Sequence, residues 1–177
     1  MIDSLITSQT RIKLLMKFFL NPNSTSYLRG LEAEFKESTN AIRIELNRFE
    51  KAKLLKAKYV KNKKIFTANT KHPLFNDINS IILKHTGLDQ VIERVAKKIG
   101  DIKEVYITGD IAKGKNTKII DLIFVGDNID KTYLLQLIEK AEKIIKRKIR
   151  FILYDTTEFT EIKTTFKPSD TLLLWRT

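Results

Sequence analysis

The residues best suited to chemistry lie in the stretch YITGDIAKGKNTKIIDLIFVGD, which runs from Tyr106 to Asp127. It has the pattern of a strand, a turn that contains Gly109 and Gly114, and a second strand that carries Asp121. A glycine turn lets backbone N–H groups approach a phosphate closely, because no Cβ stands in the way. A nearby carboxylate can ligate a divalent cation. The stretch therefore raises the question of a phosphate-and-metal site.

The same stretch resembles the signature of the minimal nucleotidyltransferase-like domains. That signature reads Gly-Ser, a short basic turn that ends in glycine, and then Asp-x-Asp at the start of the next strand. In the family, the turn approaches a triphosphate and the two carboxylates hold divalent metal ions that bridge the phosphates. The resemblance covers residues 88–165 and implies a small α/β domain. The corresponding positions here form a vestigial nucleotide site made of Gly109, Asp110, Lys113, Gly114 and Asp121.

Two residues depart from that signature. Asp110 stands where the serine belongs, and its negative charge would oppose a bound phosphate. Ile119 stands where the first metal-binding carboxylate belongs, and an isoleucine cannot ligate a metal. We therefore expect a catalytically inactive domain rather than an enzyme, with no catalytic residue, no metal site and no cofactor.

The same residues leave other interpretations open. Asp110 and Asp121 could build a different magnesium site, since the turn and the start of the strand are neighbours in this fold. The protein would then be an active nucleotidyltransferase that modifies protein or RNA, and its N-terminal half would present the substrate. Without that chemistry, the domain can still sense a small-molecule or nucleotide effector, or serve as a dimerisation surface.

The charge of the chain is distributed unevenly between its two halves. The formal net charge is +12 over 177 residues. Residues 1–72 hold 15 Lys and Arg against 6 Asp and Glu, a net charge of +9. Residues 73–177 hold 18 against 15, a net charge of +3. A basic half joined to a nearly balanced half indicates that the N-terminal part meets a polyanion.

Several protein classes are excluded by composition. The chain has no cysteine, so disulfides and thiolate metal sites are ruled out, and its two histidines stand alone. No apolar run approaches the roughly 20 residues that a membrane-spanning helix needs, and the N-terminus lacks the pattern of a signal peptide. We expect a cytoplasmic protein with no membrane partner.

The basic half has the pattern of three helices followed by a hairpin. Dense apolar residues after Ser8 predict a first helix, and Ser26 is a candidate N-cap of a short second one. Ser38 is a natural N-cap for a third helix over residues 39–53. Two short extended runs around an Asn/Lys turn, within residues 54–68, predict a β-hairpin. This order predicts a winged helix-turn-helix, mostly α with a β-hairpin wing.

The segment STNAIRIELNRFEKAKLL resembles the recognition helix and wing entry of ArsR-like and MarR-like winged-helix transcriptional regulators. The resemblance covers residues 8–70 and implies a regulator that binds duplex DNA. Lys53 departs from the family pattern, which has a glycine there to adopt a left-handed turn. The thiolate metal sensing of some ArsR-like proteins is excluded, because the chain has no cysteine.

The third helix has one apolar stripe, formed by Ile42, Leu46 and Phe49, and a polar remainder. Arginine can bind a guanine edge, asparagine can pair with adenine, and threonine or isoleucine can contact a thymine methyl group. Lysines of the hairpin would meet phosphates or the minor groove. The predicted DNA-binding residues are Ser38, Thr39, Asn40, Arg43, Ile44, Asn47, Arg48, Lys58, Lys61, Lys63 and Lys64.

The second half of the chain alternates helices with strands, which predicts a small α/β domain. We expect a winged helix-turn-helix over residues 1–72, a connecting helix over 73–87 and the nucleotidyltransferase-like domain over 88–177. The apolar tail LLLW, residues 172–175, is expected to pack on the same chain or on a second protomer.

The protein that these patterns predict is an α/β two-domain transcriptional regulator. It binds duplex DNA as a homodimer, because winged helices usually read two half-sites about one helical turn apart. A third interpretation makes the winged helix a protein-interaction module, and the basic charge of its hairpin and third helix speaks against it.

Overall fold

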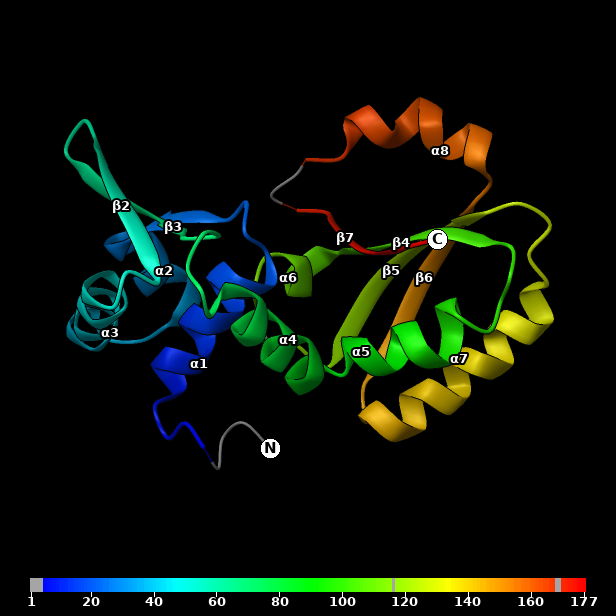
Figure 1. The fold of residues 1–177 in the computed structure, drawn as a ribbon, viewed down its shortest axis with the longest axis horizontal. Helices are drawn as coiled ribbons and strands as arrows, with labels where there is room; N and C mark the ends of the chain where they lie inside the picture. The colour runs from blue at the N-terminus through cyan, green and yellow to red at the C-terminus, as the bar shows by residue number, and fades with distance from the viewer. Residues whose placement is uncertain (1–4, 116, 168–169) are drawn as a thin grey trace. The chain divides into compact units, whose positions relative to one another are not determined.

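The computed structural model describes residues 5–115, 117–167 and 170–177. The chain divides into two compact units, residues 1–85 and 86–177, and each contains one β-sheet (Figure 1). The architecture is mixed α/β, as the sequence predicts at this level. Within the described ranges, no helix combines the length and the apolar character needed to cross a membrane.

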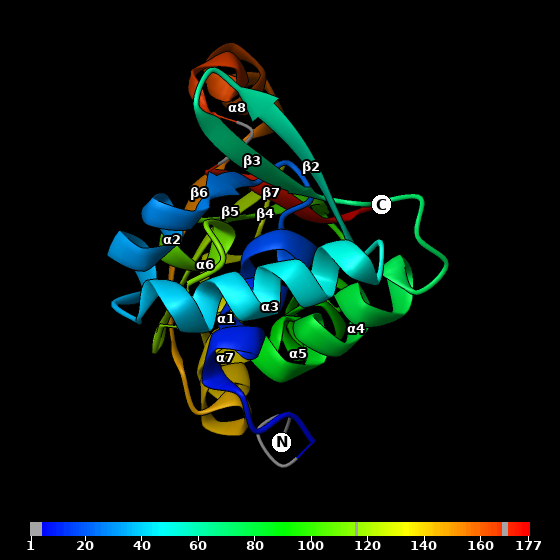
Figure 2. The same cartoon turned by 90° about the vertical axis from the view of Figure 1, so that its left-hand side faces the viewer.

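The helices of the N-terminal unit pack around an apolar core that includes Phe18, Phe19 and Leu31. The elements are α1 (Gln9–Leu15), a π-helical turn (Met16–Leu20), α2 (Leu28–Phe35), α3 (Thr39–Lys51) and α4 (Phe75–Thr86). The Ser38 hydroxyl accepts a backbone N–H group at the start of α3, which confirms the predicted N-cap, and the Ser8 hydroxyl does the same at the start of α1. Figure 2 views this unit from the side that carries α3.

The sheet of this unit has three antiparallel strands in the order β1-β3-β2. The strands are β1 (Thr25–Tyr27), β2 (Leu55–Val60) and β3 (Lys63–Ala68), so the predicted hairpin is present. Strand β1 is not predicted by the sequence, and the proposed cap at Ser26 is wrong. Ser26 lies in β1, opposite Phe66 of β3, and α2 begins after Tyr27 with no side-chain cap.

The departure at Lys53 does not disturb the exit from α3. Lys53 adopts the left-handed conformation with φ of 58°. Its N–H donates to the Glu50 carbonyl at 2.9 Å, and the Leu54 N–H donates to the Phe49 carbonyl at 2.9 Å. These two bonds form a Schellman motif, which satisfies the last carbonyls of the helix. A lysine thus occupies a backbone position that favours glycine.

The C-terminal unit is a four-stranded sheet with helices on both faces. Its helical elements are α5 (Leu88–Val91), a π-helical turn (Ile92–Ala96), α6 (Gly109–Ala112), α7 (Lys131–Ile145), α8 (Thr156–Ile162) and a 3-10 turn (Lys163–Thr165). Its strands are β4 (Ile102–Thr108), β5 (Ile119–Gly126), β6 (Lys148–Tyr154) and β7 (Leu172–Arg176). Helices α5 and α7 lie on one face and α8 lies on the other (Figure 1).

The strand order is β6-β5-β4-β7, with β5 and β6 parallel and the other pairs antiparallel. Helix α7 connects the two parallel strands, as a parallel pair requires. The apolar tail forms β7 and pairs with β4, so it packs on its own chain, which is the first of the two predicted outcomes.

Candidate nucleic-acid interface and candidate nucleotide site

Helix α3 buries one face and exposes the other. Ile42, Leu46 and Phe49 are 0%, 2% and 5% exposed, which confirms the predicted inward stripe. The predicted contact residues on the outer side are exposed, with Thr39 half-buried; the exposed ones are Asn40, Arg43, Ile44, Asn47 and Arg48. Ser38 is also exposed, but its hydroxyl is engaged as the N-cap. The role of these residues in DNA binding stays a prediction.

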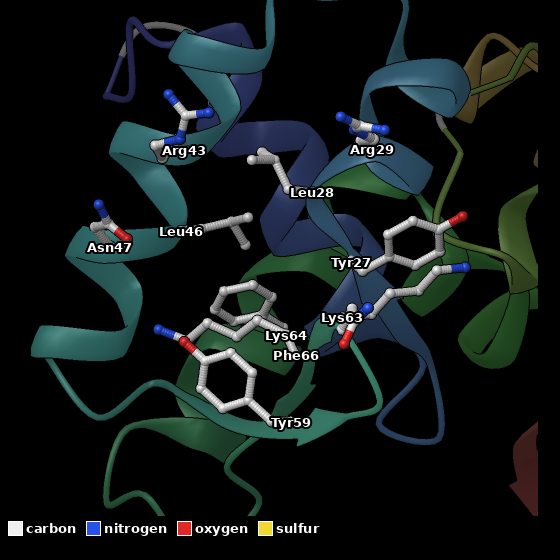
Figure 3. Close-up of a pocket in the computed structure, with 11 residues that line it drawn as sticks. Tyr27, Leu28, Arg29, Arg43, Leu46, Asn47, Tyr59, Lys63, Lys64 and Phe66 are labelled. Carbon is white, nitrogen blue, oxygen red and sulfur yellow. The ribbon is translucent and has the colours of Figure 1, made fainter.

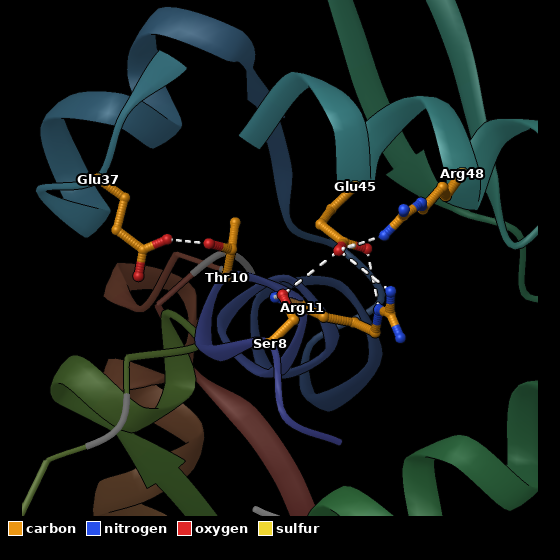
Figure 4. Close-up of polar contacts among 6 residues, drawn as sticks. All are labelled: Ser8, Thr10, Arg11, Glu37, Glu45 and Arg48. Atoms are coloured by element: carbon orange, nitrogen blue, oxygen red, sulfur yellow. Dashed lines mark hydrogen bonds and ion pairs between the residues drawn. The ribbon is translucent and has the colours of Figure 1, made fainter. Parts of the chain in front are cut away.

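A buried carboxylate, Glu45, lies within this helix and joins it to α1 (Figure 4). It accepts hydrogen bonds from Arg11 Nε at 2.9 Å and Nη2 at 3.1 Å, from Arg48 Nη1 at 2.9 Å and from the Ser8 hydroxyl at 3.3 Å. Burial opposes its ionisation, but the bond from Arg11 and the charges of Arg11 and Arg48 outweigh burial and lower the pKa of Glu45. Glu45 therefore stays charged and holds α3 against α1.

A second carboxylate, Glu37, lies in the turn before α3 (Figure 4). It accepts hydrogen bonds from the Thr10 hydroxyl and from Lys13 Nζ, both on α1. Burial raises the pKa of Glu37, but the bonds from Lys13 and Thr10 and the charge of Lys13 outweigh burial, so the net effect is a lowered pKa. The two carboxylates thus attach α3 and its preceding turn to α1.

Sequence reasoning missed both carboxylates, although Glu45 leaves a recognisable signal. It falls three residues after Ile42 and four before Phe49, so it interrupts the apolar face of the helix. A carboxylate at such a position requires a cationic partner, because an unpaired buried charge is costly.

The four predicted lysines of the hairpin differ in their exposure to solvent. Lys58, Lys61 and Lys63 are exposed, and Lys61 forms the tight turn with φ of 52°. Lys64 is half-buried, and its Nζ pairs with Glu50 of α3 at 2.6 Å. Three of the four predicted hairpin contacts are thus accessible, whereas Lys64 bridges the hairpin to α3.

In the C-terminal unit the structure brings Gly109 next to Asp121. Strand pairing sets Thr108 opposite Asp121, and Gly109 follows at the start of α6 with φ of 66°. A Cβ added to Gly109 would lie 2.5 Å from Asp121 Oδ2. Glycine is required there both by the left-handed backbone and by the nearby carboxylate.

The Asp121 carboxylate is paired with a residue that the sequence analysis did not single out. Arg150 lies directly opposite on β6, and its Nε donates to Asp121 Oδ1 at 2.7 Å. The hydrogen bond and charge of Asp121 raise the pKa of Arg150. This ion pair could not be predicted from the sequence, because it depends on the register of β5 with β6, which no local pattern specifies.

The other predicted residues of this site, Asp110, Lys113 and Gly114, each interact with a different partner. Asp110 is exposed and accepts from Lys115 Nζ at 3.2 Å, and Lys113 Nζ lies 3.6 Å from Asp170. Gly114 has φ of 83° and donates its N–H to the Ile111 carbonyl at 2.8 Å. Over the described ranges, no group of three or more His, Cys, Asp or Glu side chains is arranged to hold a metal ion.

Comparisons with known proteins give similarities in structure only. No family model matches the chain, and no curated protein matches it. One similar solved structure is a mutant of the toxin–antitoxin pair MntA–HpeT, 14% identical with a TM-score of 0.39, over 50% of this chain and 72% of that chain. Another is a candidate nucleotidyltransferase from Sulfolobus solfataricus, 25% identical with a TM-score of 0.37, over 56% of this chain and 86% of that chain.

The expectation that the chain is not an enzyme is contradicted by these comparisons. It rested on Ile119, yet a candidate nucleotidyltransferase is among the structures that the chain resembles. At TM-scores below 0.5, neither similarity assigns a substrate or a reaction to this chain.

Proposed function

We propose that this protein binds duplex DNA through α3 and the β2–β3 hairpin, as a transcriptional regulator with a winged helix-turn-helix. The observation that carries the proposal is the combination of an exposed polar face on α3 with three exposed hairpin lysines. Both belong to the half of the chain with a net charge of +9. Helix α3 is also held rigidly, because Glu45 and Glu37 attach it and its preceding turn to α1.

The proposed roles follow from side-chain chemistry. Arg43 and Asn47 read base edges in the major groove, since arginine suits guanine and asparagine suits adenine. Lys58, Lys61 and Lys63 contact phosphates, which fix the position of the protein on the duplex. Binding is then expected to weaken steeply with salt, because each phosphate contact releases a counterion.

The experiment compares two double variants that change the net charge equally. Arg43→Ala with Lys63→Ala removes one base contact and one phosphate contact. Arg94→Ala with Lys98→Ala removes two exposed cations from the C-terminal unit instead. Fluorescence anisotropy on a pool of random-sequence duplexes, repeated over a salt series, measures both affinity and salt dependence.

We expect the first double variant to lose about tenfold in affinity, because it removes two cations from the proposed DNA-binding face, and the second to stay within about twofold. The salt slope should fall by about one phosphate contact in the first variant alone. Equal behaviour of the two variants, or an affinity that salt does not change, would contradict the proposal. If the expected difference is found, a genome-wide binding selection would supply the operator.

The proposed regulator acts as a homodimer, since winged helices usually read two half-sites. The C-terminal unit would bind a small-molecule or nucleotide effector or provide the dimer surface. A rise in melting temperature with ATP or GTP would support the effector role, because a ligand of the folded state must stabilise it.

Nucleotidyl transfer to protein or RNA is the second candidate function. The observation in its favour is the approach of Asp121 to the Gly109 turn, which places a carboxylate beside backbone that can approach a phosphate. The residues do not fit a two-metal site, because Ile119 replaces one carboxylate and Arg150 pairs with the other. Triphosphate charge would instead meet the cations Arg150 and Lys113.

This candidate is tested by incubation with labelled nucleoside triphosphates, with and without magnesium. Covalent label that appears on protein or RNA with wild type and is lost in Asp121→Asn would establish transfer. Lys97→Ala, which changes an exposed residue on the surface of the same unit, is the matched control. Label that Asp121→Asn leaves unchanged would count against this site.

A further inference from the structure

A hollow in the N-terminal unit lies between α3, the start of α2 and the β2–β3 hairpin (Figure 3). Its volume is about 640 Å³, within the range of about 300–1,000 Å³ that is usual for small-ligand sites. Arg43 and Asn47, the proposed base-reading residues, form part of its wall. The hollow therefore adjoins the face proposed to bind DNA.

The inner wall of the hollow is apolar, and an exposed aromatic ring stands at its edge. Leu46 and Phe66 are 2% and 4% exposed, whereas Tyr59 is 76% exposed. The register sets Ala57 opposite Phe66, so Tyr59, two residues on, shares the hairpin face of Phe66. An exposed tyrosine beside an apolar wall is suited to stack on a flat aromatic ligand.

The rim of the hollow is positive. It includes the exposed side chains Arg29, Arg43 and Lys63. None of them forms an ion pair in the described part of the chain, and Lys63 Nζ lies 4.4 Å from the centre of the Tyr27 ring. The nearby Lys64, by contrast, is paired with Glu50. Accessible cations around an apolar, aromatic hollow favour a ligand that joins a flat ring to an anionic group. A nucleotide unit of a nucleic-acid strand has both.

A continuous duplex cannot fill this hollow. Its bases are stacked on one another and expose only their edges in the grooves, while its outer surface is phosphate and sugar. The exposed ring of Tyr59 would then have no base face to stack on. A base reaches a concave aromatic site only when it leaves the stack, as in single strands, overhangs and extrahelical positions.

We infer that the hollow accepts an unpaired base from a strand that leaves the duplex held by α3. The base stacks on Tyr59, and the adjoining phosphate meets Arg29. The inference rests on the proposed binding of nucleic acid by this unit. It makes the preferred substrate a junction between duplex and single strand rather than a duplex alone.

The test compares a blunt random-sequence duplex with the same duplex extended by a single-stranded overhang. Anisotropy gives the two affinities, and 2-aminopurine in the overhang reports on stacking. Tyr59→Ala removes the ring, Tyr59→Phe keeps it, and Tyr133→Ala removes an exposed tyrosine from α7 as the control. Tyr59 is exposed, so its replacement is expected to leave folding intact.

Wild type should bind the extended duplex about tenfold more tightly than the blunt one, because a stacked base contributes on that order. Tyr59→Ala should abolish the preference without weakening blunt-duplex binding more than about twofold, and Tyr59→Phe and Tyr133→Ala should keep it. Salt-sensitive binding with equal affinity for both substrates would overturn the inference alone. Failure to bind either substrate would overturn the proposed function as well. Mononucleotides that compete as well as the overhang would overturn the assignment to a strand.

Discussion

The α3–hairpin face and the Gly109 turn both carry clustered charged residues. They differ in which of these charges are already paired within the protein. On the first, Arg48 pairs with Glu45 and Lys64 with Glu50, but Arg43 and Lys63 are exposed with no ion-pair partner within the described ranges. In the second, Asp121 is paired with Arg150 and Asp110 with Lys115. Charges that are already paired inside the protein are less available to a ligand. The comparison shows that the ion pairs a charged residue makes inside the protein, and not its residue type alone, decide whether it can bind a ligand.

The largest expected effect on stability is at the turn of the C-terminal unit. Gly109→Ala should destabilise that unit by about 2 kcal/mol or more, because a side chain there is strained at positive φ and meets Asp121. Gly100→Ala, where a Cβ would meet no atom within 4 Å, should cost much less. Urea denaturation followed by the fluorescence of Trp175 reports on this unit. Similar losses in the two variants would show that the turn is not constrained.

Two substitutions that each replace a carboxylate by the corresponding amide compare the two regions directly. Glu45→Gln should cost about 1–2 kcal/mol, since a buried carboxylate that binds two arginines loses its charge. Asp121→Asn should cost less than about 1 kcal/mol, because its partner Arg150 is largely exposed. Circular dichroism during urea unfolding measures the two losses. A larger loss at Asp121 would reverse the comparison.

The N-terminal unit should also lose stability in acid through Glu45. The pKa of Glu45 is lower in the folded state than in the unfolded chain, so the unfolded state binds the proton more readily. The stabilisation is present above the unfolded pKa of about 4.3 and is lost as pH falls through the folded value. Melting temperatures between neutral pH and about pH 3 should therefore fall less in Glu45→Gln than in wild type. If the melting temperatures of the two proteins fell equally with pH, Glu45 would not be the cause of the loss of stability in acid.

The smallest expected effect is at the exit from α3. Lys53→Gly relieves a left-handed lysine, but glycine also gains freedom in the unfolded chain. The net gain should be below about 1 kcal/mol, measured as a small rise in the urea midpoint. Lys56→Gly, in β2, is the control and should destabilise.

Local patterns predicted much of the fold. Helix α7 (Lys131–Ile145) and strand β6 (Lys148–Tyr154) belong to the alternation of helices and strands that the sequence predicts, because apolar periodicity and flanking polar residues specify them locally. The inward stripe of α3 and its cap at Ser38 follow from the same rules. Strand β1 was missed, because three residues carry no periodicity and the strand exists only through pairing with β3.

The sequence by itself determined the basic N-terminal half, the polar outer face of α3 and the glycines of the C-terminal turn, since composition and spacing are properties of the chain alone. The tertiary structure decided which charges are engaged. Glu45 meets Arg11, 34 residues away, and Asp121 meets Arg150, 29 residues away. Such pairs depend on helix packing and strand register, which bring distant residues within hydrogen-bonding distance. One of them holds the carboxylate at the Gly109 turn in an ion pair, whereas Arg43 and Tyr59 of the hollow stay exposed.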